Sequence, residues 1–124
     1  MALGRVLEAT VRLNVYLRQP DGHVKSITAD GWGFSQITGD KILIVRDLRS
    51  QVVHVLGRVR RRTQIPSEDL RLMMRARVVE ESITSSGRSE WEFYLEEIDE
   101  QTKHAVMRGP IIEPGSVVGG GIRL

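Results

Sequence analysis

Hydrophobic and polar residues alternate along much of this chain, and the longest such run lies near its beginning. From Leu7 to Leu17 every second residue is apolar, while the residues between them are Glu, Thr, Arg, Asn and Tyr. Side chains alternate between the two faces of a β-strand, so this run predicts a strand with one buried face. The following stretch QPDGH (19–23) supplies a proline and an Asp-Gly pair, which predicts a hairpin turn.

Five later stretches alternate in the same way or are rich in β-branched and aromatic residues, which favour strands. They are VKSITA (24–29), GWGFSQI (31–37), KILIV (41–45), QVVHVLGRVRR (51–61) and EWEFYLEEI (90–98). The Gly-Trp-Gly step is predicted to form a corner between the first two of these strands. The polar stretch DEQTKH (99–104) is predicted as a turn that leads into AVMRG (105–109).

The segment IPSEDLRLMMRARVVEE (65–81) fits two secondary structures. Ser67 followed by two acidic residues is typical of a helix start, because a hydroxyl cap and nearby acids stabilise a helix N-terminus. From Leu70 to Val78, however, apolar residues recur at every second position, as they do in a strand. The alternation favours a strand preceded by a helical turn, and a short helix near residues 67–80 is the alternative.

Together these elements predict a mainly β fold. Seven or eight short strands separated by frequent turns are typical of a single small antiparallel barrel or sandwich. A chain of 124 residues is long enough to bury its own hydrophobic core. The expected organisation is a β-barrel-like domain over residues 1–110 and a Pro/Gly-rich C-terminal tail over residues 111–124.

Composition narrows the function classes. The chain has no cysteine, which excludes disulfides and thiolate chemistry, and its three histidines lack the spacing of metal ligands. It has neither an apolar run as long as a membrane span nor the layout of a signal peptide at its start. No nucleophile motif or phosphate-binding loop is present in the sequence. We therefore expect a cytoplasmic protein that is not an enzyme and that has no cofactor, metal or membrane partner.

Charge supplies the strongest functional lead. Residues 1–79 carry 14 Lys and Arg against 7 Asp and Glu, whereas residues 80–124 carry 4 against 9. In GRVRRRT, alternation would place Arg58, Arg60 and Arg62 on one face of a strand. Neighbouring guanidiniums repel each other unless an anion lies among them, and Arg binds phosphate with two N–H groups at once. This face is predicted either to bind a phosphate-bearing partner or to be a charged edge, open to solvent or paired with the acidic second half.

A second set of arginines follows in the segment that fits two secondary structures. If that segment is a strand, Arg71, Arg75 and Arg77 lie on one of its faces. Aromatic residues make up only 5% of the chain, which argues against a stacking platform for single-stranded nucleic acid. Arginine, and not aromatic stacking, is therefore the feature that suggests binding.

Three segments resemble parts of PilZ domains and occur in the same order. KSITADGWGF (25–34) resembles the PilZ segment with the pattern DxSxxG, whose Asp, Ser and Gly help hold cyclic di-GMP. VVHVLGRVRR (52–61) resembles a later barrel strand, and WEFYLEEIDEQTKHAV (91–106) resembles the closing strand and the segment after it. The resemblance implies a β-barrel that binds a cyclic dinucleotide. The residues that it assigns to the ligand, with the tryptophan beside them, are Ser26, Thr28, Gly31 and Trp32.

Two departures from the PilZ pattern bear on this implied ligand. Ser26 stands where the family has its first Asp, which keeps a polar group but loses the charge. The RxxxR motif of the family lies upstream of DxSxxG, whereas residues 1–25 contain none and the pair Arg58 and Arg62 lies downstream. With these departures, the sequence resembles degenerate PilZ members, which bind proteins in place of the nucleotide.

The first functional hypothesis is a non-catalytic binding module with an Arg-rich face. Its partner would bear phosphate, either as a nucleotide second messenger such as a cyclic dinucleotide or as nucleic acid. The alternative is a structural subunit of a larger assembly (a ring, a tube or a virion component), in which oppositely charged halves of a homo-oligomer meet. A protein-binding regulatory adaptor is the second alternative. The candidate ligand-binding residues are Arg58, Arg60, Arg62, Ser26, Thr28, Gly31 and Trp32.

Overall fold

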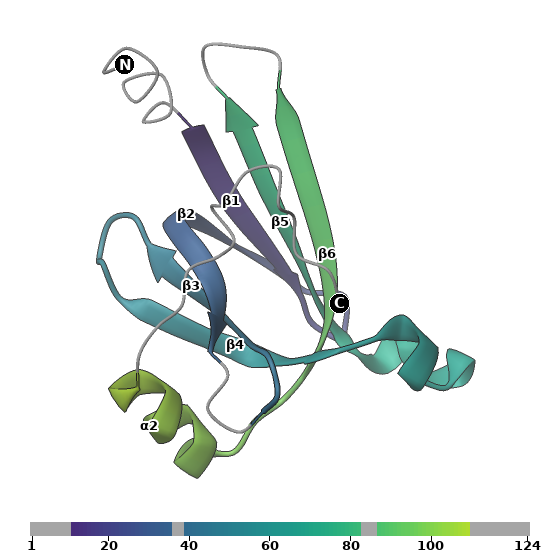
Figure 1. The fold of residues 1–124 in the computed structure, drawn as a ribbon. Helices are drawn as coiled ribbons and strands as arrows, with labels where there is room; N and C mark the ends of the chain where they lie inside the picture. The colour runs from purple at the N-terminus through teal and green to yellow at the C-terminus, as the bar shows by residue number, and fades with distance from the viewer. Residues whose placement is uncertain (1–10, 36–38, 83–86, 110–124) are drawn as a thin grey trace.

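Six antiparallel strands form a closed barrel in the computed structural model, which describes residues 11–35, 39–82 and 87–109 (Figure 1). The strands are β1 (Val11–Arg18), β2 (Val24–Ser35), β3 (Ile42–Asp47), β4 (Val53–Arg60), β5 (Met74–Ser82) and β6 (Arg88–Glu96). Around the barrel their order is β1-β2-β3-β4-β6-β5, and β5 closes the barrel by pairing with β1. The predicted fold class, a mainly β chain that forms a small antiparallel barrel, is confirmed.

The first hairpin forms as its alternation predicts. Strand β1 buries Leu13, Val15 and Leu17 in the barrel core, and the side chains between them lie on the outer face. The turn to β2 is closed by a hydrogen bond of 2.8 Å that the backbone N–H of Gln19 donates to the carbonyl of His23. Gly22 in this turn has φ +90°, a left-handed conformation that favours glycine.

Strand β2 runs continuously through the Gly-Trp-Gly step, but its pairing with β3 shifts there. The register moves from Ala29 directly to Gly31, so Asp30 is an extra residue and forms a β-bulge. The bulge reverses the alternation: Ala29 faces the core before it, and Trp32 and Phe34 face the core after it. The predicted corner is therefore a bulge within one strand, and the two strands predicted on either side of it are one.

Four aromatic rings pack together inside the barrel. The ring centroid of Trp32 lies 5.1 Å from that of Trp91 and 5.8 Å from that of Phe93. Phe34 lies 6.0 Å from Trp32 and meets the Phe93 ring edge to face at 5.7 Å. Such pairs add about 0.5–1.5 kcal/mol each beyond the burial of their surface. They join β2 to β6 across the interior, although these two strands are not neighbours in the sheet.

The turn predicted for residues 99–104 is wrong, because residues 100–104 belong to the α-helix α2 (Glu100–Arg108). Asp99 caps the helix by accepting a hydrogen bond of 2.7 Å from the backbone N–H of Thr102. Only one side chain of the helix is fully buried, so the sequence carries no repeated apolar face that would predict a helix. A short polar helix with a single apolar contact is therefore read from its sequence as a turn.

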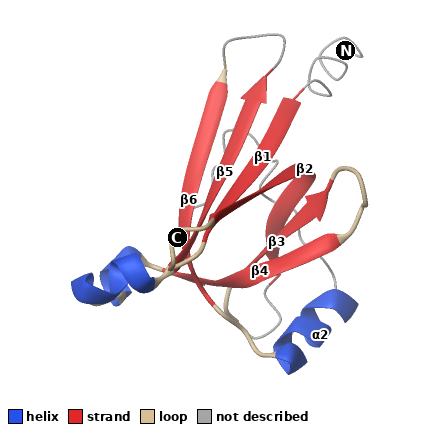
Figure 2. Ribbon diagram, turned by 180° about the vertical axis from the view of Figure 1, so that it is seen from behind, coloured by secondary structure: helices blue, strands red, loops and turns tan. Residues whose placement is uncertain are grey.

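Helix α2 covers the outer side of β3 and β4 (Figure 2). Its single buried side chain, Val106, packs against Ile42 and Ile44 of β3 in a second hydrophobic cluster outside the barrel. Leu43 and Val45 of the same strand point into the barrel core. Both faces of β3 are buried for this reason, which accounts for its uninterrupted apolar sequence.

Two short 3₁₀ helices connect β4 to β5. They are η1 (Arg62–Gln64) and η2 (Ser67–Leu72), and β5 begins two residues after η2, at Met74. In both ribbon views they project outward from the barrel and away from α2 (Figures 1 and 2). The prediction of a helical turn followed by a strand in this segment is confirmed.

Some sequence predictions fall outside the described residues. These are the first part of the strand predicted from Leu7 to Leu17 and the Pro/Gly-rich tail over residues 111–124. Among the residues that are described, no helix is both long and apolar enough to cross a membrane.

Candidate functional site

Outward-facing side chains lie in rows across the barrel surface, because paired residues of neighbouring strands point to the same side of the sheet. Followed from β2 through β1, β5 and β6 to β4, one row is Val24, Arg18, Arg75, Tyr94 and Arg60. The next row, from β2 to β6, is Ser26, Tyr16, Arg77 and Glu92. Arginines stand in the middle of both rows. We call Arg18, Arg75 and Arg77 the basic face.

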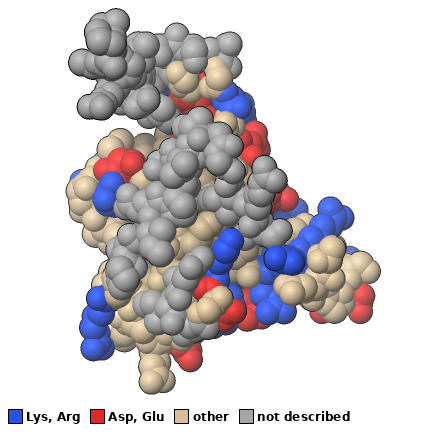
Figure 3. Space-filling model, viewed as in Figure 1, with Lys and Arg blue, Asp and Glu red and all other residues tan. Residues whose placement is uncertain are grey.

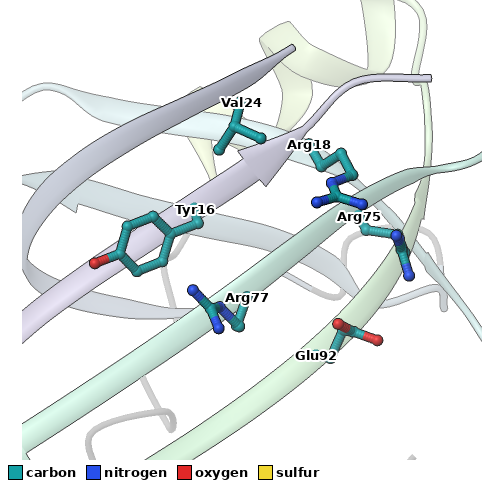
Figure 4. Close-up of a pocket in the computed structure, with 6 residues that line it drawn as sticks. All are labelled: Tyr16, Arg18, Val24, Arg75, Arg77 and Glu92. Carbon is teal, nitrogen blue, oxygen red and sulfur yellow. The ribbon is translucent and has the colours of Figure 1, made fainter. Parts of the chain in front are cut away.

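An open cavity of about 350 Å³ lies over the basic face (Figure 4). Its lining residues come from β1, β2, β5 and β6 and are Tyr16, Arg18, Val24, Arg75, Arg77 and Glu92. Arg18 lies beside Arg75 at one end of this cavity, and Tyr16 lies beside Arg77 at the other (Figure 4). The cavity therefore offers three cationic groups against a single carboxylate.

Two of these arginines are held against aromatic rings. The guanidinium carbon of Arg77 lies 4.8 Å from the ring centroid of Tyr16, and that of Arg75 lies 6.0 Å from the ring centroid of Tyr94. Stacking on a ring restrains a guanidinium while leaving its N–H groups free to bind an anion. Arg77 also forms an ion pair of 3.3 Å with Glu90, so part of its hydrogen-bonding capacity is already used.

The charge at the other end of the cavity is not balanced. Arg18 and Arg75 occupy directly opposed positions on β1 and β5, and neither forms an ion pair with any residue that the structure describes. Like charges in such opposed positions destabilise a sheet. An anion bound between them would replace this repulsion by attraction, and phosphate suits the two-pronged geometry of arginine.

Of the three arginines that the sequence places on one face, the structure keeps Arg58 and Arg60 on one face of β4 and places Arg62 outside the strand. Arg58 lies on β4 and is neutralised by Asp40 at 3.0 Å and Glu96 at 3.1 Å. Strand β4 ends at Arg60, and Arg62 lies in η1, so the prediction of one strand face for all three is wrong. The strand ends because no apolar side chain follows Val59 until Ile65, and nothing holds the residues between them against the core.

Two further arginines near this connection, Arg60 and Arg71, lie in different elements. Arg60 belongs to the row that contains Arg75 and Arg18, with Tyr94 between them. Lys and Arg side chains gather where the chain passes from β4 through the 3₁₀ helices (Figure 3). Arg71 lies in η2, so only Arg75 and Arg77 of the second predicted set share a strand face.

The polar residues of the PilZ-like segment lie on the outer side of β2. Ser26 is exposed and pairs with Tyr16, which lines the cavity, so its hydroxyl stands at the edge of the basic face. Thr28 is also exposed, and its hydroxyl donates a hydrogen bond of 3.4 Å to the side-chain oxygen of Asn14 on β1. The structure therefore brings Ser26, but not the arginines predicted with it, beside a basic cavity.

Gly31 and Trp32 of the same segment are buried and belong to the interior. The Trp32 side chain is 1% exposed, and its ring N–H donates a hydrogen bond of 3.3 Å to Glu80 on β5. Burial raises the pKa of the Glu80 carboxyl above its ordinary value, and this hydrogen bond opposes the rise. These residues support the barrel and do not reach the outer face where the cavity lies.

Sequence reasoning missed Arg18, Tyr16 and Glu92 as members of the site. Tyr16 and Arg18 lie on β1 and Glu92 lies on β6, whereas Arg75 lies on β5. The signal that could have found Arg18 is the first hairpin together with the closure of the barrel, which sets β1 beside β5. That closure depends on strand order, and alternation within one strand does not report it.

No cluster of three or more His, Asp or Glu side chains able to hold a metal ion occurs in the described ranges. Comparisons with protein-family models, curated proteins and solved structures found no match to this chain. The chemistry of the cavity is therefore the basis for a proposed function.

Proposed function

We propose that this protein is a non-catalytic binding module whose basic face holds a small phosphate-bearing ligand, with a nucleotide as the first candidate. The observation that carries the proposal is the direct opposition of Arg18 and Arg75 on paired strands. No described carboxylate forms an ion pair with either of them, so a bound phosphate would relieve their repulsion and accept hydrogen bonds from both.

The surroundings of these arginines favour a ligand that is only partly charged. Val24 is 46% exposed at the rim of the cavity, and the ring of Tyr16 lines its other end. An apolar wall beside cationic groups matches a molecule in which a base or sugar is joined to phosphate, because each part then meets suitable chemistry. Inorganic phosphate would use only the charged end.

The PilZ resemblance stays a prediction, because a six-stranded barrel does not by itself identify a family. It does supply a specific ligand to try. Ser26, one of the residues that the resemblance assigns to cyclic di-GMP, lies in the same row as Tyr16 and Arg77. A cyclic dinucleotide carries two phosphates, which suits a face with more than one arginine.

Nucleic acid fits the basic face less well than a nucleotide does. Glu90 and Glu92 lie on β6 directly beside Arg77, so carboxylates border the basic face on that side. Nucleic-acid surfaces gain their affinity by neutralising several successive phosphates along a strand. Three arginines bordered by acids provide a short anion site and no extended track.

Calorimetric titration with cyclic di-GMP, ATP and inorganic phosphate tests the proposal. We expect at least one of the two nucleotides to bind more tightly than phosphate. Arg75→Gln should weaken that binding about tenfold or more, or about 1.4 kcal/mol, through loss of one bidentate contact. Arg49→Gln is the matched control, because Arg49 is an exposed arginine in the turn between β3 and β4, away from the cavity.

Two results would overturn the proposal. One is the absence of binding by all three probes at millimolar concentration, and the other is an equal loss of affinity in the Arg49→Gln control. If instead an oligonucleotide binds more tightly than either nucleotide, with affinity that falls steeply as salt rises, the ligand is nucleic acid.

A further inference from the structure

A second and larger cavity, of about 450 Å³, lies on the part of the barrel near η2 and α2. Apolar side chains from β4, η2, β5 and β6 and from the link to α2 line it together. We call this cavity the apolar cleft and define it by Leu56, Leu72, Met73, Met74, Leu95 and Ile98. It is separate from the basic face, since Met74 and Arg75 are chain neighbours that point to opposite sides of β5.

The apolar cleft leaves hydrophobic surface in contact with water. Leu72, at the end of η2, is 61% exposed and is the most exposed large apolar side chain among the described residues. Met73 and Met74 follow it directly, and methionine side chains adapt their shape to whatever packs on them. Leu56, Met73, Met74 and Ile98 are half-buried and Leu95 is buried, so an occupant would cover Leu72 and pack on the partly exposed sides of its neighbours.

The rim of the apolar cleft is acidic. Glu96, Glu97 and Glu100 lie around it, with Lys103 as the one cation among its lining residues. Lys103 approaches Glu100 at 3.9 Å, and Arg58 neutralises Glu96. Glu97 forms no ion pair with any residue in the described part of the chain. The rim therefore keeps negative charge that an occupant with positive charge would neutralise.

We propose that the apolar cleft binds a short segment of a partner protein in which a large apolar side chain is flanked by Lys or Arg. The apolar side chain would insert among Leu72, Met73 and Leu56, and a basic group would meet Glu97 at the rim. This is the arrangement expected of a peptide site, in which an apolar anchor supplies affinity and rim charges select the partner.

Other occupants fit the apolar cleft less well. A surface of anionic lipids would be repelled by the acidic rim. A second copy offers exposed apolar residues beside a cation at Val24, Leu48 and Met107, but these are held in a paired strand, a turn and helix α2, so none of them is a free segment that could enter the cleft. An apolar and basic segment of another protein satisfies both the interior and the rim of the cleft.

Nuclear magnetic resonance titration of the ¹⁵N-labelled full chain tests this proposal with three synthetic hexapeptides. One alternates Lys with Leu, one alternates Lys with Ser, and one alternates Glu with Leu. We expect the Lys/Leu peptide alone to give saturable shifts at Leu72, Met73 and Ile98. Leu72→Ser should weaken its binding about tenfold, while Leu48→Ser, the matched control at a 48% exposed leucine in another turn, should not.

Glu97→Lys provides a second variant that tests the rim without altering an apolar residue, and it should also weaken binding of the Lys/Leu peptide. Several outcomes would overturn the proposal. They are no cleft shifts at millimolar peptide, equal binding of the Glu/Leu peptide, or equal loss of affinity in Leu48→Ser. Sedimentation of the free protein tests whether a second copy of the chain occupies the cleft. A dimer that Leu72→Ser converts to monomer would assign the cleft to a second copy and contradict a separate partner.

Discussion

The two faces of β5 contribute to different parts of the molecule, and they are held in place by different forces. On the inner face Ala76 and Val78 are fully buried and contact the core on every side. On the outer face Arg75 and Arg77 contact aromatic rings and form one surface ion pair with the described residues. Packing therefore determines Ala76 and Val78, whereas we expect that Arg75 and Arg77 can change without loss of the fold. Binding chemistry is expected on the outer face for this reason.

The same comparison explains why the two cavities differ in character. The basic face is part of the outward pattern of the strands, so its lining residues are mostly polar or charged. The apolar cleft is lined in part by inward residues, half-buried Met74 of β5 and buried Leu95 of β6, together with Leu72 of η2. One cavity is thus a feature of strand alternation, and the other lies where side chains of the barrel meet η2 and the link to α2.

The largest expected effect comes from placing a charge on the inner face of β5. Val78→Asp should lower the free energy of unfolding by more than about 4 kcal/mol, because it buries a carboxylate without a partner. Arg77→Ser, one residue away on the outer face, should cost no more than about 1 kcal/mol. Urea denaturation of both variants measures the difference. Similar losses in the two variants would mean that packing does not distinguish the two faces of β5.

A smaller effect on the free energy of unfolding should distinguish an arginine in ion pairs, Arg58, from an arginine that faces another arginine, Arg75. Arg58→Gln should lower the free energy of unfolding by about 1 kcal/mol, because it leaves Asp40 and Glu96 without their shared cation. Arg75→Gln should change it by less than about 0.5 kcal/mol, or raise it, because it removes repulsion with Arg18. Salt should reduce the difference between the variants by screening both effects. If Arg75→Gln is the more destabilising change, Arg75 serves stability and the proposed anion site loses its basis.

The sequence predicts the strands well and the site only in part, for a physical reason. Alternation within a strand reports which residues face the core, and it places Leu13, Val15 and Phe93 correctly. It cannot report which strands are neighbours, and the opposition of Arg18 and Arg75 depends on that. Counting arginines along one strand led to Arg58, Arg60 and Arg62, whereas the structure gathers arginines from different strands.

Two further differences between the predicted site and the structure have identifiable causes. The pairing of Arg58 with Asp40 and Glu96 joins three segments of the chain, so no short stretch of sequence reveals that this arginine is neutralised. The bulge at Asp30 turns Trp32 inward, and without it strict alternation from Ala29 would place that indole on the outer face. A single inserted residue therefore moves a predicted ligand contact into the core.

The smallest predicted effect concerns the one acidic residue on the inner face of β5, Glu80. Its carboxyl accepts the hydrogen bond from the Trp32 ring, and burial raises its pKa above the ordinary value of 4.5. A raised pKa favours the protonated acid in the folded state. The stability that Glu80 contributes is therefore fully present below pH 4.5 and is lost as pH rises through the folded-state pKa.

Glu80→Gln tests this prediction because glutamine is uncharged at every pH and can still accept the Trp32 hydrogen bond. Asp30, Asp47 and Asp99 have lowered pKa values, so their contributions are lost as pH falls through their folded-state pKa values, and they are common to both proteins. The difference in unfolding free energy between variant and wild type removes them. We expect that difference to be constant in acid and to grow in favour of Glu80→Gln as pH rises toward neutral, measured by urea denaturation across this range. A difference that stays constant over the whole range would show that Glu80 reaches water freely and that this end of the inner face is open.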